Sequence, residues 1–363
     1  MNKQSLTKII AFYLPQFHPI PENDRWWGKG FTEWTNVRNA KPLFPGHEQP
    51  IEPGELGYYN LLDPEIRNRQ AELARDHGIY GFCYWHYWFG NGKTLLEKPL
   101  QQVIKSGEPD FPFCLGWANE SWTGIWHGSP DKILMKQEYP GDDDIKRHFE
   151  YILPAISDSR YIKIDGKPFF LIYRPDSHPH LRRFVELFNK LSQQHGWDGF
   201  HFVATNVSEN WPIRKYGFEA WVPPYHHRAV WGSSSNISAK ALQWLKKKVR
   251  SDESKKLKVY SYQEAMRYFL PKNYNETYYP ALIPNWDNSP RSGKNAVIFN
   301  GSTPELFKQH VEQALTIIKK NPPSQQIAMI KSWNEWAEGN YIEPDKKWGR
   351  AYLMVIKQAV SEF

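Results

Sequence analysis

The run Ile9-Ile10-Ala11-Phe12-Tyr13-Leu14 is the first of eight short apolar segments that decide the fold of this chain of 363 residues. These segments are rich in β-branched and aromatic residues and show little alternation of polar and apolar positions, which is typical of strands buried on both faces. The other seven runs are Tyr80–Trp85, Phe113–Trp117, Phe169–Tyr173, Phe202–Thr205, Ala220–Val222, Ala281–Ile283 and Ile327–Ile330. We therefore expect eight parallel strands.

Segments of helical periodicity separate most of these runs. Asp63 and Thr303 are each followed by proline, so each can cap the N-terminus of a helix. Apolar residues recur at helical spacing from Leu181 to Leu191, and a last helix is expected near Arg350–Ser361. Strands and helices that alternate in this way favour a parallel α/β architecture.

A (β/α)8 barrel of the TIM type fits this alternation better than an open doubly wound sheet. No glycine-rich dinucleotide motif follows the first run, where the only match is a lone Gly-x-Gly in a tryptophan-rich loop. We predict one catalytic domain over residues 1–363, with Ile9–Leu14 and Ile327–Ile330 as parallel neighbours. Two connections, Pro15–Asn60 and Pro223–Tyr279, are longer than usual, and long loops in a barrel usually build the active-site face.

The composition is that of a soluble globular protein, with 40% hydrophobic and 23% charged residues. No apolar run approaches the roughly 20 residues that span a bilayer. The run Ile9–Leu14 is too short for the core of a signal peptide. Cys83 and Cys114 lie inside apolar runs, which favours buried thiols in a reducing compartment over a disulfide. We expect a cytoplasmic protein without a transmembrane segment.

The formal net charge of +7 is concentrated in one segment, Lys246–Lys258, which contains seven basic residues and two acidic ones. A basic cluster can contact anionic lipid, nucleic acid or phosphorylated ligands, but it is more often a solvated helix face. No aromatic or glycine-rich recognition pattern accompanies it. We therefore predict no nucleic-acid partner and at most a weak contact with an anionic surface through this segment.

Polar and aromatic residues gather directly after the predicted strands, where the side chains of a barrel converge on one cavity. The chain has 17 Trp and 20 Tyr, and such side chains suit sugars because they combine an apolar face with a polar edge. We expect an oligosaccharide or polysaccharide substrate. The predicted substrate-binding residues are Tyr13, Tyr84, Trp85, His86, Trp117, Asn119, Glu120, Tyr225, Trp286, Asp287 and Asn334.

The segment Trp333-Asn334-Glu335-Trp336-Ala337-Glu338, after the last strand, carries the sharpest chemical signal. Glycoside cleavage requires one carboxyl group as an acid and a second as a base or nucleophile. Glu335 and Glu338 are three residues apart, so one helical turn would place both on the same side. A solvated helix face would give the same spacing, but the preceding apolar run and the indoles on either side of Glu335 argue against full solvation. We predict that both are catalytic.

Several motifs together resemble a known family. Residues 333–339 (Trp-Asn-Glu-Trp-Ala-Glu-Gly), followed by Ile342-Glu343-Pro344, are similar to the strand-eight signature of glycoside hydrolase family 99, the endo-α-mannosidases and endo-α-mannanases. Residues 11–18 (Ala-Phe-Tyr-Leu-Pro-Gln-Phe-His), 26–28, 31–37, 78–88 and 284–291 resemble the bacterial WbsX-like branch more closely. The resemblance covers nearly the whole chain.

This resemblance implies a (β/α)8 barrel and a retaining mechanism without an enzyme nucleophile. The residue that matches Glu335 would act as a base on the sugar 2-hydroxyl group, and the residue that matches Glu338 would protonate the leaving oxygen and then activate water. The substrate would be an α-linked, mannose-like glycoside. WbsX-like proteins are commonly described as glycosyltransferases of surface-polysaccharide biosynthesis, which is the alternative activity.

Other assignments remain open at this point. Glu120 also follows an asparagine at a strand end, so Glu120 and Glu335 would form an ordinary retaining pair if their carboxyl groups lay about 5 Å apart. A nucleotide-sugar glycosyltransferase would need an acidic metal motif such as Asp142-Asp143-Asp144, but acids at a helix start are expected as caps. A non-catalytic carbohydrate-binding protein would explain the tryptophans but not the paired acids. We predict no cofactor and no metal ligands.

Overall fold

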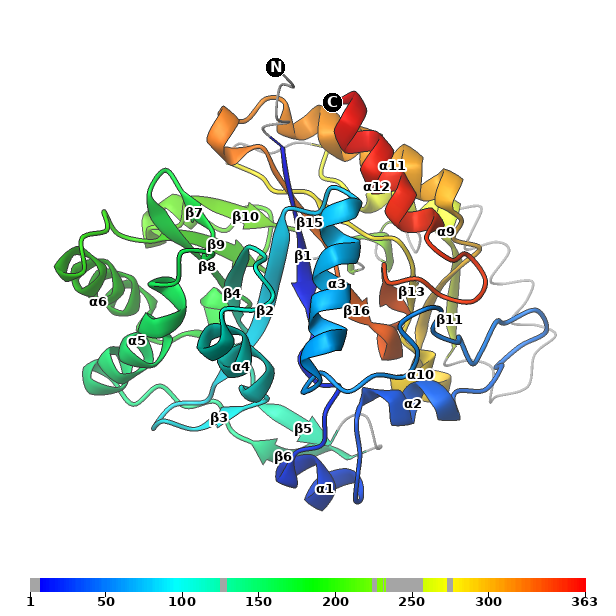
Figure 1. Cartoon of the computed structure of the whole chain (residues 1–363), viewed down its shortest axis with the longest axis horizontal. Helices are drawn as coiled ribbons and strands as arrows, with labels where there is room; N and C mark the ends of the chain where they lie inside the picture. The colour runs from blue at the N-terminus through cyan, green and yellow to red at the C-terminus, as the bar shows by residue number, and fades with distance from the viewer. Residues whose placement is uncertain (1–6, 125–128, 224–226, 231, 233–256, 273–276) are drawn as a thin grey trace.

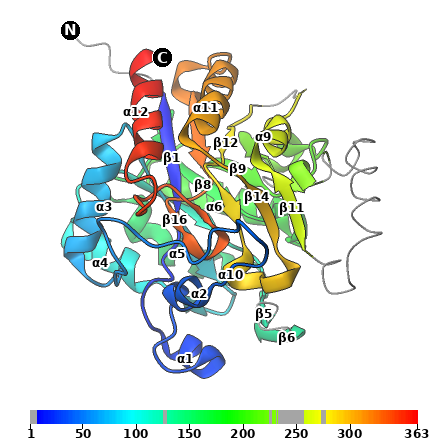
Figure 2. The same cartoon turned by 90° about the vertical axis from the view of Figure 1, so that its right-hand side faces the viewer.

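The computed structural model describes residues 7–124, 129–223, 227–230, 232, 257–272 and 277–363. Its main sheet contains eight parallel strands that are nearly closed into a barrel, with helices outside (Figures 1 and 2). All eight predicted runs form strands of this sheet. Their order is β10 (Ala220–Val222), β9 (His201–Thr205), β8 (Lys167–Ile172), β4 (Phe113–Trp117), β2 (Gly81–Trp88), β1 (Lys8–Tyr13), β15 (Ile327–Ile330) and β12 (Ala281–Leu282).

The first and last predicted runs are neighbours in this sheet, as expected. β1 pairs with β15 in parallel, with Ile9 opposite Ala328 and Ala11 opposite Ile330. The remaining gap between β10 and β12 is bridged just before β12 begins, where Trp221 and Tyr278 form a parallel bridge. The main-chain N–H of Tyr279 donates to the carbonyl of Trp221 at 2.9 Å. This bridge brings the two edge strands together and nearly closes the ring of strands.

The outer helices begin where the capping signals predict. The side chain of Asp63 accepts from the backbone N–H of Glu65, and that of Thr303 accepts from Leu306. Each cap satisfies one of the N–H groups that a helix start leaves without a partner. Within the described residues, the α-helices are α1 (Pro21–Trp27), α2 (Glu33–Asn39), α3 (Pro64–Asp76), α4 (Lys98–Ser106), α5 (Asp142–Ile156), α6 (Leu181–Gln194), α9 (Tyr262–Ala265), α10 (Ser289–Ser292), α11 (Pro304–Ile318) and α12 (Ala351–Glu362).

Short elements in the loops complete the described part of the chain. The loop after β1 carries α1 and α2, and the loop after β10 carries β11 and α9. The additional strands are β3 (Thr94–Leu95), β5 (Trp122–Gly124), β6 (Ser129–Met135), β7 (Lys163–Ile164), β11 (Lys258–Ser261), β13 (Trp286–Asp287), β14 (Val297–Asn300), β16 (Asn334–Glu335) and β17 (Asn340–Tyr341). The short 3-10 helices are η2 (Pro175–Ser177), η3 (Ile213–Tyr216), η5 (Met266–Tyr268), η6 (Gly293–Asn295), η7 (Pro323–Gln325) and η8 (Trp336–Glu338).

Side chains alternate between the inside and the outside of the barrel, because successive residues of a strand point to opposite faces. Phe12 of β1 stacks on Trp85 of β2, with ring centroids 4.7 Å apart, inside the ring. Gly116 of β4 makes room for this indole, since a Cβ atom there would lie 3.3 Å from it. Tyr13, next to Phe12, points the other way and donates to Gln70 of α3 at 2.7 Å.

Two sequence predictions concern residues outside the described ranges: Tyr225 and nearly all of the basic segment Lys246–Lys258. Cys83 and Cys114 are buried, and neither forms a disulfide. Over the described residues, no helix has the length and apolar character that a membrane crossing requires.

Candidate active site

The end of β15 leads directly into the segment that carries the paired glutamates. The short strand β16 pairs with β17, and η8 turns the chain between them. Gly339 follows this turn with a φ of +52°, and a Cβ atom there would lie 2.8 Å from Asp287. Only glycine therefore fits this tight return. The turn places the side chains of Glu335 and Glu338 on the same side, as the spacing predicts.

Arg291 holds both carboxyl groups with a single nitrogen atom. Its Nη1 lies 2.9 Å from Oε1 of Glu335 and 2.8 Å from Oε1 of Glu338. Lys331, immediately after β15, approaches the other two oxygens, with Nζ 3.5 Å from Oε2 of Glu335 and 3.9 Å from Oε2 of Glu338. The two glutamates are therefore bracketed by two cations.

A third carboxyl group completes this cluster. Nη2 of Arg291 lies 3.0 Å from Oε2 of Glu33, the first residue of α2. The side chains of Glu33 and Arg291 are 0% and 4% exposed, so this pair is shielded from water. Removal of one partner from a buried ion pair leaves an uncompensated charge, which typically destabilises a protein by about 3–5 kcal/mol. Arg291 thus links the first long loop of the barrel to its last strand.

The environment gives the two glutamates different proton affinities. Burial and the neighbouring charge of Glu335 raise the pKa of Glu338 to about 7. Burial also acts to raise the pKa of Glu335, but Lys331 and Arg291 outweigh it and hold that pKa below its usual value. Near neutral pH, Glu335 is ionised while Glu338 retains a proton for much of the time. Carboxyl groups whose pKa values are pushed apart in this way suit the roles of base and acid.

These carboxyl groups face a cavity of about 410 Å³ at the end of the barrel. This volume is within the range of about 300–1,000 Å³ that small-molecule sites occupy. The cavity is lined by Leu14, Gln16, Trp27, Trp85, Tyr87, Ala118, Glu120, Ser121, Trp122, Thr123, Leu134, Tyr173, Arg291, Lys331, Glu335 and Glu338. Aromatic rings and a few charged groups thus surround the candidate acid and base.

Two of the predicted substrate-binding residues line this cavity. Trp85 reaches it from inside the barrel, where it packs between Phe12 and Tyr173. Glu120 lies after β4, with its carboxylate 3.1 Å from Nη1 of Arg174 and its side chain 50% exposed. Glu120 is therefore much more open to water than Glu335, whose side chain is 10% exposed.

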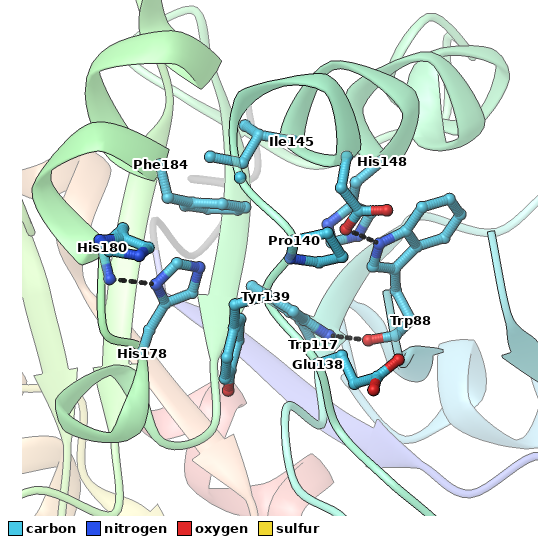
Figure 3. A pocket seen from close by; sticks show the side chains of 12 residues that line it. Trp88, Trp117, Glu138, Tyr139, Pro140, Ile145, His148, His178, His180 and Phe184 are labelled. Atoms are coloured by element: carbon cyan, nitrogen blue, oxygen red, sulfur yellow. Dashed lines mark hydrogen bonds between the residues drawn. The ribbon is translucent and has the colours of Figure 1, made fainter. Parts of the chain in front are cut away.

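Four other predicted residues, Tyr13, Tyr84, His86 and Trp117, lie on the outer face of the strands. Figure 3 shows Trp117 in a small pocket beside His148 and Phe184, where its indole N–H donates to the carbonyl of Trp88 at 2.9 Å. Tyr13 donates to Gln70 of α3, Tyr84 contacts Tyr13 and Phe113, and Nε2 of His86 lies 2.8 Å from Nε2 of His148. The prediction that these four line the same cavity as Glu335 and Glu338 is corrected, because the alternation of the strands turns them toward the helices.

The two asparagines of the site, Asn334 and Asn119, form hydrogen bonds with backbone groups instead of facing the cavity. Asn334 Oδ1 accepts from the N–H of Leu14 at 2.8 Å, and its Nδ2 donates to the carbonyl of Leu14 at 3.1 Å. Asn119 makes the same pair of bonds with Arg174, at 2.7 and 2.8 Å. Each asparagine therefore ties the end of its own strand to the end of the neighbouring strand and fixes the glutamate that follows it.

Trp286 and Asp287 line a separate cavity of about 640 Å³, between the first long loop and the loop after β15. Nζ of Lys331 lies 5.3 Å from the centre of the Trp286 ring, so this indole supports the lysine that contacts both glutamates. The carboxylate of Asp287 accepts from Gln49 Nε2 at 2.7 Å and lies 2.7 Å from His47 Nε2. A direct contact of Trp286 or Asp287 with substrate stays a prediction.

The residues predicted for the site do not include Arg291, Lys331, Glu33 or the cavity residues Tyr87 and Tyr173. Lys331 comes directly after β15, so the rule that strand ends line the site could have found it. Arg291 and Glu33 lie inside motifs that were recognised, but no spacing rule connects a loop at residue 33 with a turn at residue 291. Among the described residues, no group of three or more His, Cys, Asp or Glu is placed to hold a metal ion.

Comparison with known proteins places this chain in a family. Residues 9–356 match the family model described as glycosyltransferase WbsX. Two relatives from strains of Xanthomonas campestris pv. campestris, both named uncharacterized protein WxcX, are 36% and 34% identical over 357 and 362 residues. Each match covers 97% of this chain but 49% of the relative. The chain therefore spans about half the length of these relatives.

Solved structures show the same fold. The GH99 endo-α-mannosidase of Bacteroides thetaiotaomicron superimposes with a TM-score of 0.60 and 16% identity, covering 98% of this chain and 96% of that one. A glycoside hydrolase-like protein gives a TM-score of 0.55 with 14% identity, covering 97% and 93%. At such low identity the similarity shows the (β/α)8 fold alone. The match over residues 9–356 shows the family, and the chain belongs to the WbsX family.

Proposed function

We propose that this chain is a carbohydrate-active enzyme that cleaves, or transfers from, an α-linked and mannose-like glycoside with retention of configuration. In this proposal Glu335 is the base and Glu338 is the acid. The observation that carries it is the geometry of two carboxyl groups that share one guanidinium nitrogen in an aromatic-lined cavity, where the surroundings lower the pKa of Glu335 and raise that of Glu338. Membership of a family described as glycosyltransferases and a fold shared with an endo-α-mannosidase both support carbohydrate chemistry.

The proposed first step uses both groups at once. Glu335 accepts the proton of the sugar 2-hydroxyl group, whose oxygen attacks the anomeric carbon and forms a 1,2-anhydro sugar. The glycosidic bond breaks, and Glu338 transfers its proton to the leaving oxygen. Acid and base groups of this kind typically contribute about 10²–10⁴-fold each to the rate. The ionised Glu335 and the partly protonated Glu338 have the charge states that this step requires.

The second step decides between hydrolysis and transfer. Glu338, now ionised, accepts a proton from the incoming hydroxyl as that oxygen attacks the anomeric carbon and opens the anhydro ring. The 2-oxygen recovers its proton from Glu335. If the incoming hydroxyl belongs to water the enzyme is a glycosidase, and if it belongs to a sugar the enzyme is a transglycosylase. The family description favours transfer as the second candidate.

A nucleotide-sugar donor is not part of this proposal. The acidic run that could mimic a metal motif, Asp142 to Asp144, forms the first turn of α5. Asp144 accepts from Trp88 Nε1 at 3.1 Å and from the N–H of Asn91 at 2.6 Å, and Asp142 pairs with Arg183 at 2.6 Å. These contacts account for Asp142 and Asp144 as structural residues.

The test is incubation of the purified protein with a panel of α-linked glycans, with and without nucleotide sugars, and detection of products by mass. We expect shortened or rearranged α-mannosides without any nucleotide sugar, and no product from a Glu335→Gln, Glu338→Gln double variant. Products that form only when a nucleotide sugar is added would overturn the proposal. Glycan binding without any turnover would favour a carbohydrate-binding protein.

A further inference from the structure

Glu33 is a buried carboxyl group to which the proposed mechanism gives no part. It begins α2 in the loop after β1, and its backbone N–H donates to the carbonyl of Gln16 at 3.2 Å. Its side chain is fully buried, and burial is the main cause that raises its pKa. A buried carboxyl group is unfavourable unless it is compensated, so its presence here calls for a physical reason.

The guanidinium of Arg291 divides its donors between Glu33 and the paired glutamates. Nε and Nη2 both reach the same oxygen of Glu33, at 3.2 and 3.0 Å. Nη1 serves Glu335 and Glu338. Because a guanidinium is planar and rigid, the two nitrogens held by Glu33 fix the direction in which the third one points. The position of Nη1 between the two glutamates is therefore set from the Glu33 side.

The cluster also has an uneven count of charges. Three carboxyl groups, Glu33, Glu335 and Glu338, face two cations, Arg291 and Lys331. One proton on the three carboxyl groups makes the cluster neutral, and a buried cluster favours neutrality because net charge is costly in a low dielectric. The negative charge of Glu33 is one of the causes that raise the pKa of Glu338.

We propose that Glu33 is a positioning residue for Glu335 and Glu338, acting through Arg291. This inference rests on the proposed function, in which Glu338 must hold a proton. Glu33 orients the guanidinium and offsets part of its charge, so that Arg291 binds both glutamates without stripping the proton from Glu338. If Glu33 only attached its loop to the barrel, its loss would change stability and leave the titration of Glu338 in place.

Other titratable groups lie around this cluster. Among the described residues, further titratable groups that interact with it electrostatically include Tyr87 on β2, Tyr173 after β8 and His227. Asp287 on β13 packs beside η8, but its carboxylate is held by Gln49 and His47. Burial raises the pKa of both tyrosines well above neutrality, so they stay uncharged there. Glu33 is thus the carboxyl group that competes directly for Arg291.

The test is a pH titration of carboxyl carbons by NMR in protein labelled with ¹³C-glutamate. The Glu338 signal is assigned by its absence in Glu338→Gln. Glu33→Gln keeps an oxygen acceptor for Arg291 but removes the charge, so we expect the midpoint of Glu338 to fall by at least about half a pH unit, since a nearby charge of like sign raises a carboxyl pKa. Glu343→Gln is the matched control, because Glu343 is an equally buried glutamate that contacts Gln70 and Trp336.

An unchanged Glu338 midpoint in folded Glu33→Gln protein would overturn the inference. An equal fall in Glu343→Gln would also overturn it, because the effect would then not pass through Arg291. If Glu33→Gln does not fold, Glu33→Asp tests the same coupling, because its shorter side chain lies farther from Arg291. In that variant we expect the titration midpoint of Glu338 to fall as well, but by less. The midpoint is measured without substrate, so an inactive wild-type protein would count against the proposed function and not against this coupling.

Discussion

Asn334 binds the backbone of Leu14 from both sides, accepting from its N–H at 2.8 Å and donating to its carbonyl at 3.1 Å. These bonds join the end of β15 to the end of β1, its neighbour in the barrel. The glutamate next in sequence, Glu335, is thereby held over the cavity. Asn119 and Arg174 repeat the arrangement between β4 and β8, and there the next residue is Glu120.

Replacement of Asn334 by aspartate should show the importance of this link. An aspartate has almost the same shape but cannot donate to the carbonyl of Leu14, so a buried acceptor loses its partner. The expected loss is about 1–3 kcal/mol in the free energy of unfolding, measured by urea denaturation. Turnover should fall as well, because Glu335 loses its fixed position. Full stability and full activity in Asn334→Asp would show that the link is dispensable.

Lys331→Met should move the pH profile of kcat/KM toward higher pH. Lys331 lowers the pKa of both glutamates, so its removal raises both. The acidic limb, which reports the ionisation of Glu335, and the alkaline limb, which reports Glu338, then shift in the same direction. Lys347→Met is the control, because Lys347 likewise lies over an indole, Trp348, and pairs with Glu48. A profile that shifts equally in both variants would contradict this assignment.

Trp85 and Trp117 should respond differently to substitution. Trp85 lines the cavity, so Trp85→Ala should weaken glycan binding by roughly tenfold, which corresponds to about 1.4 kcal/mol. Trp117 packs outside the barrel and donates to Trp88, so Trp117→Phe should lower the free energy of unfolding by about 1–3 kcal/mol without changing affinity. Calorimetric titration and urea denaturation measure the two effects. Weaker binding in Trp117→Phe than in Trp85→Ala would reverse the assignment.

The buried histidines should make the protein lose stability in mild acid. Burial lowers the pKa of His310 to about 4, against the opposing effect of its bond to the carbonyl of Ala281. In the unfolded chain, His310 therefore binds a proton near pH 6.5, whereas in the folded chain it stays neutral until the pH approaches 4. The free energy of unfolding thus decreases as the pH falls from 6.5 toward 4. His310→Gln keeps the hydrogen-bond donor but does not titrate. Between pH 7 and pH 4, the free energy of unfolding of His310→Gln should decrease less than that of the wild-type protein, by up to about 3 kcal/mol. Urea denaturation at each pH measures this difference.

Much of the fold could be predicted because strand runs and helix caps are local signals. All eight apolar runs form barrel strands, and both predicted caps, Asp63 and Thr303, are present. The position of the paired glutamates on one side of a turn also followed from their spacing alone. Each of these predictions depends on residues that are close together in the sequence.

The cavity was predicted less well, for two physical reasons. The prediction treats all residues at strand ends alike, but alternation sends Tyr13 and His86 outward while Trp85 points inward. When the alternation is applied to each strand, Tyr13 and His86 are no longer predicted to line the cavity. The contact between Arg291 and Glu33 joins residues 258 positions apart, and such long-range pairing leaves no periodic trace in the sequence.

The most direct test of the account compares kcat/KM of Glu335→Gln and Glu338→Gln on two α-glycosides of the same sugar, one with a good leaving group and one with a poor one. We predict that Glu338→Gln loses about 10²–10⁴-fold on the poor leaving group and far less on the good one, because a good leaving group needs little protonation. Glu335→Gln should lose about as much on both, since the sugar hydroxyl lacks its base in either case. Turnover within a few-fold of wild type for either variant would contradict the assignment of that residue. If Glu120→Gln were as damaging as Glu335→Gln while Glu338→Gln was mild, Glu120 and Glu335 would be the catalytic pair.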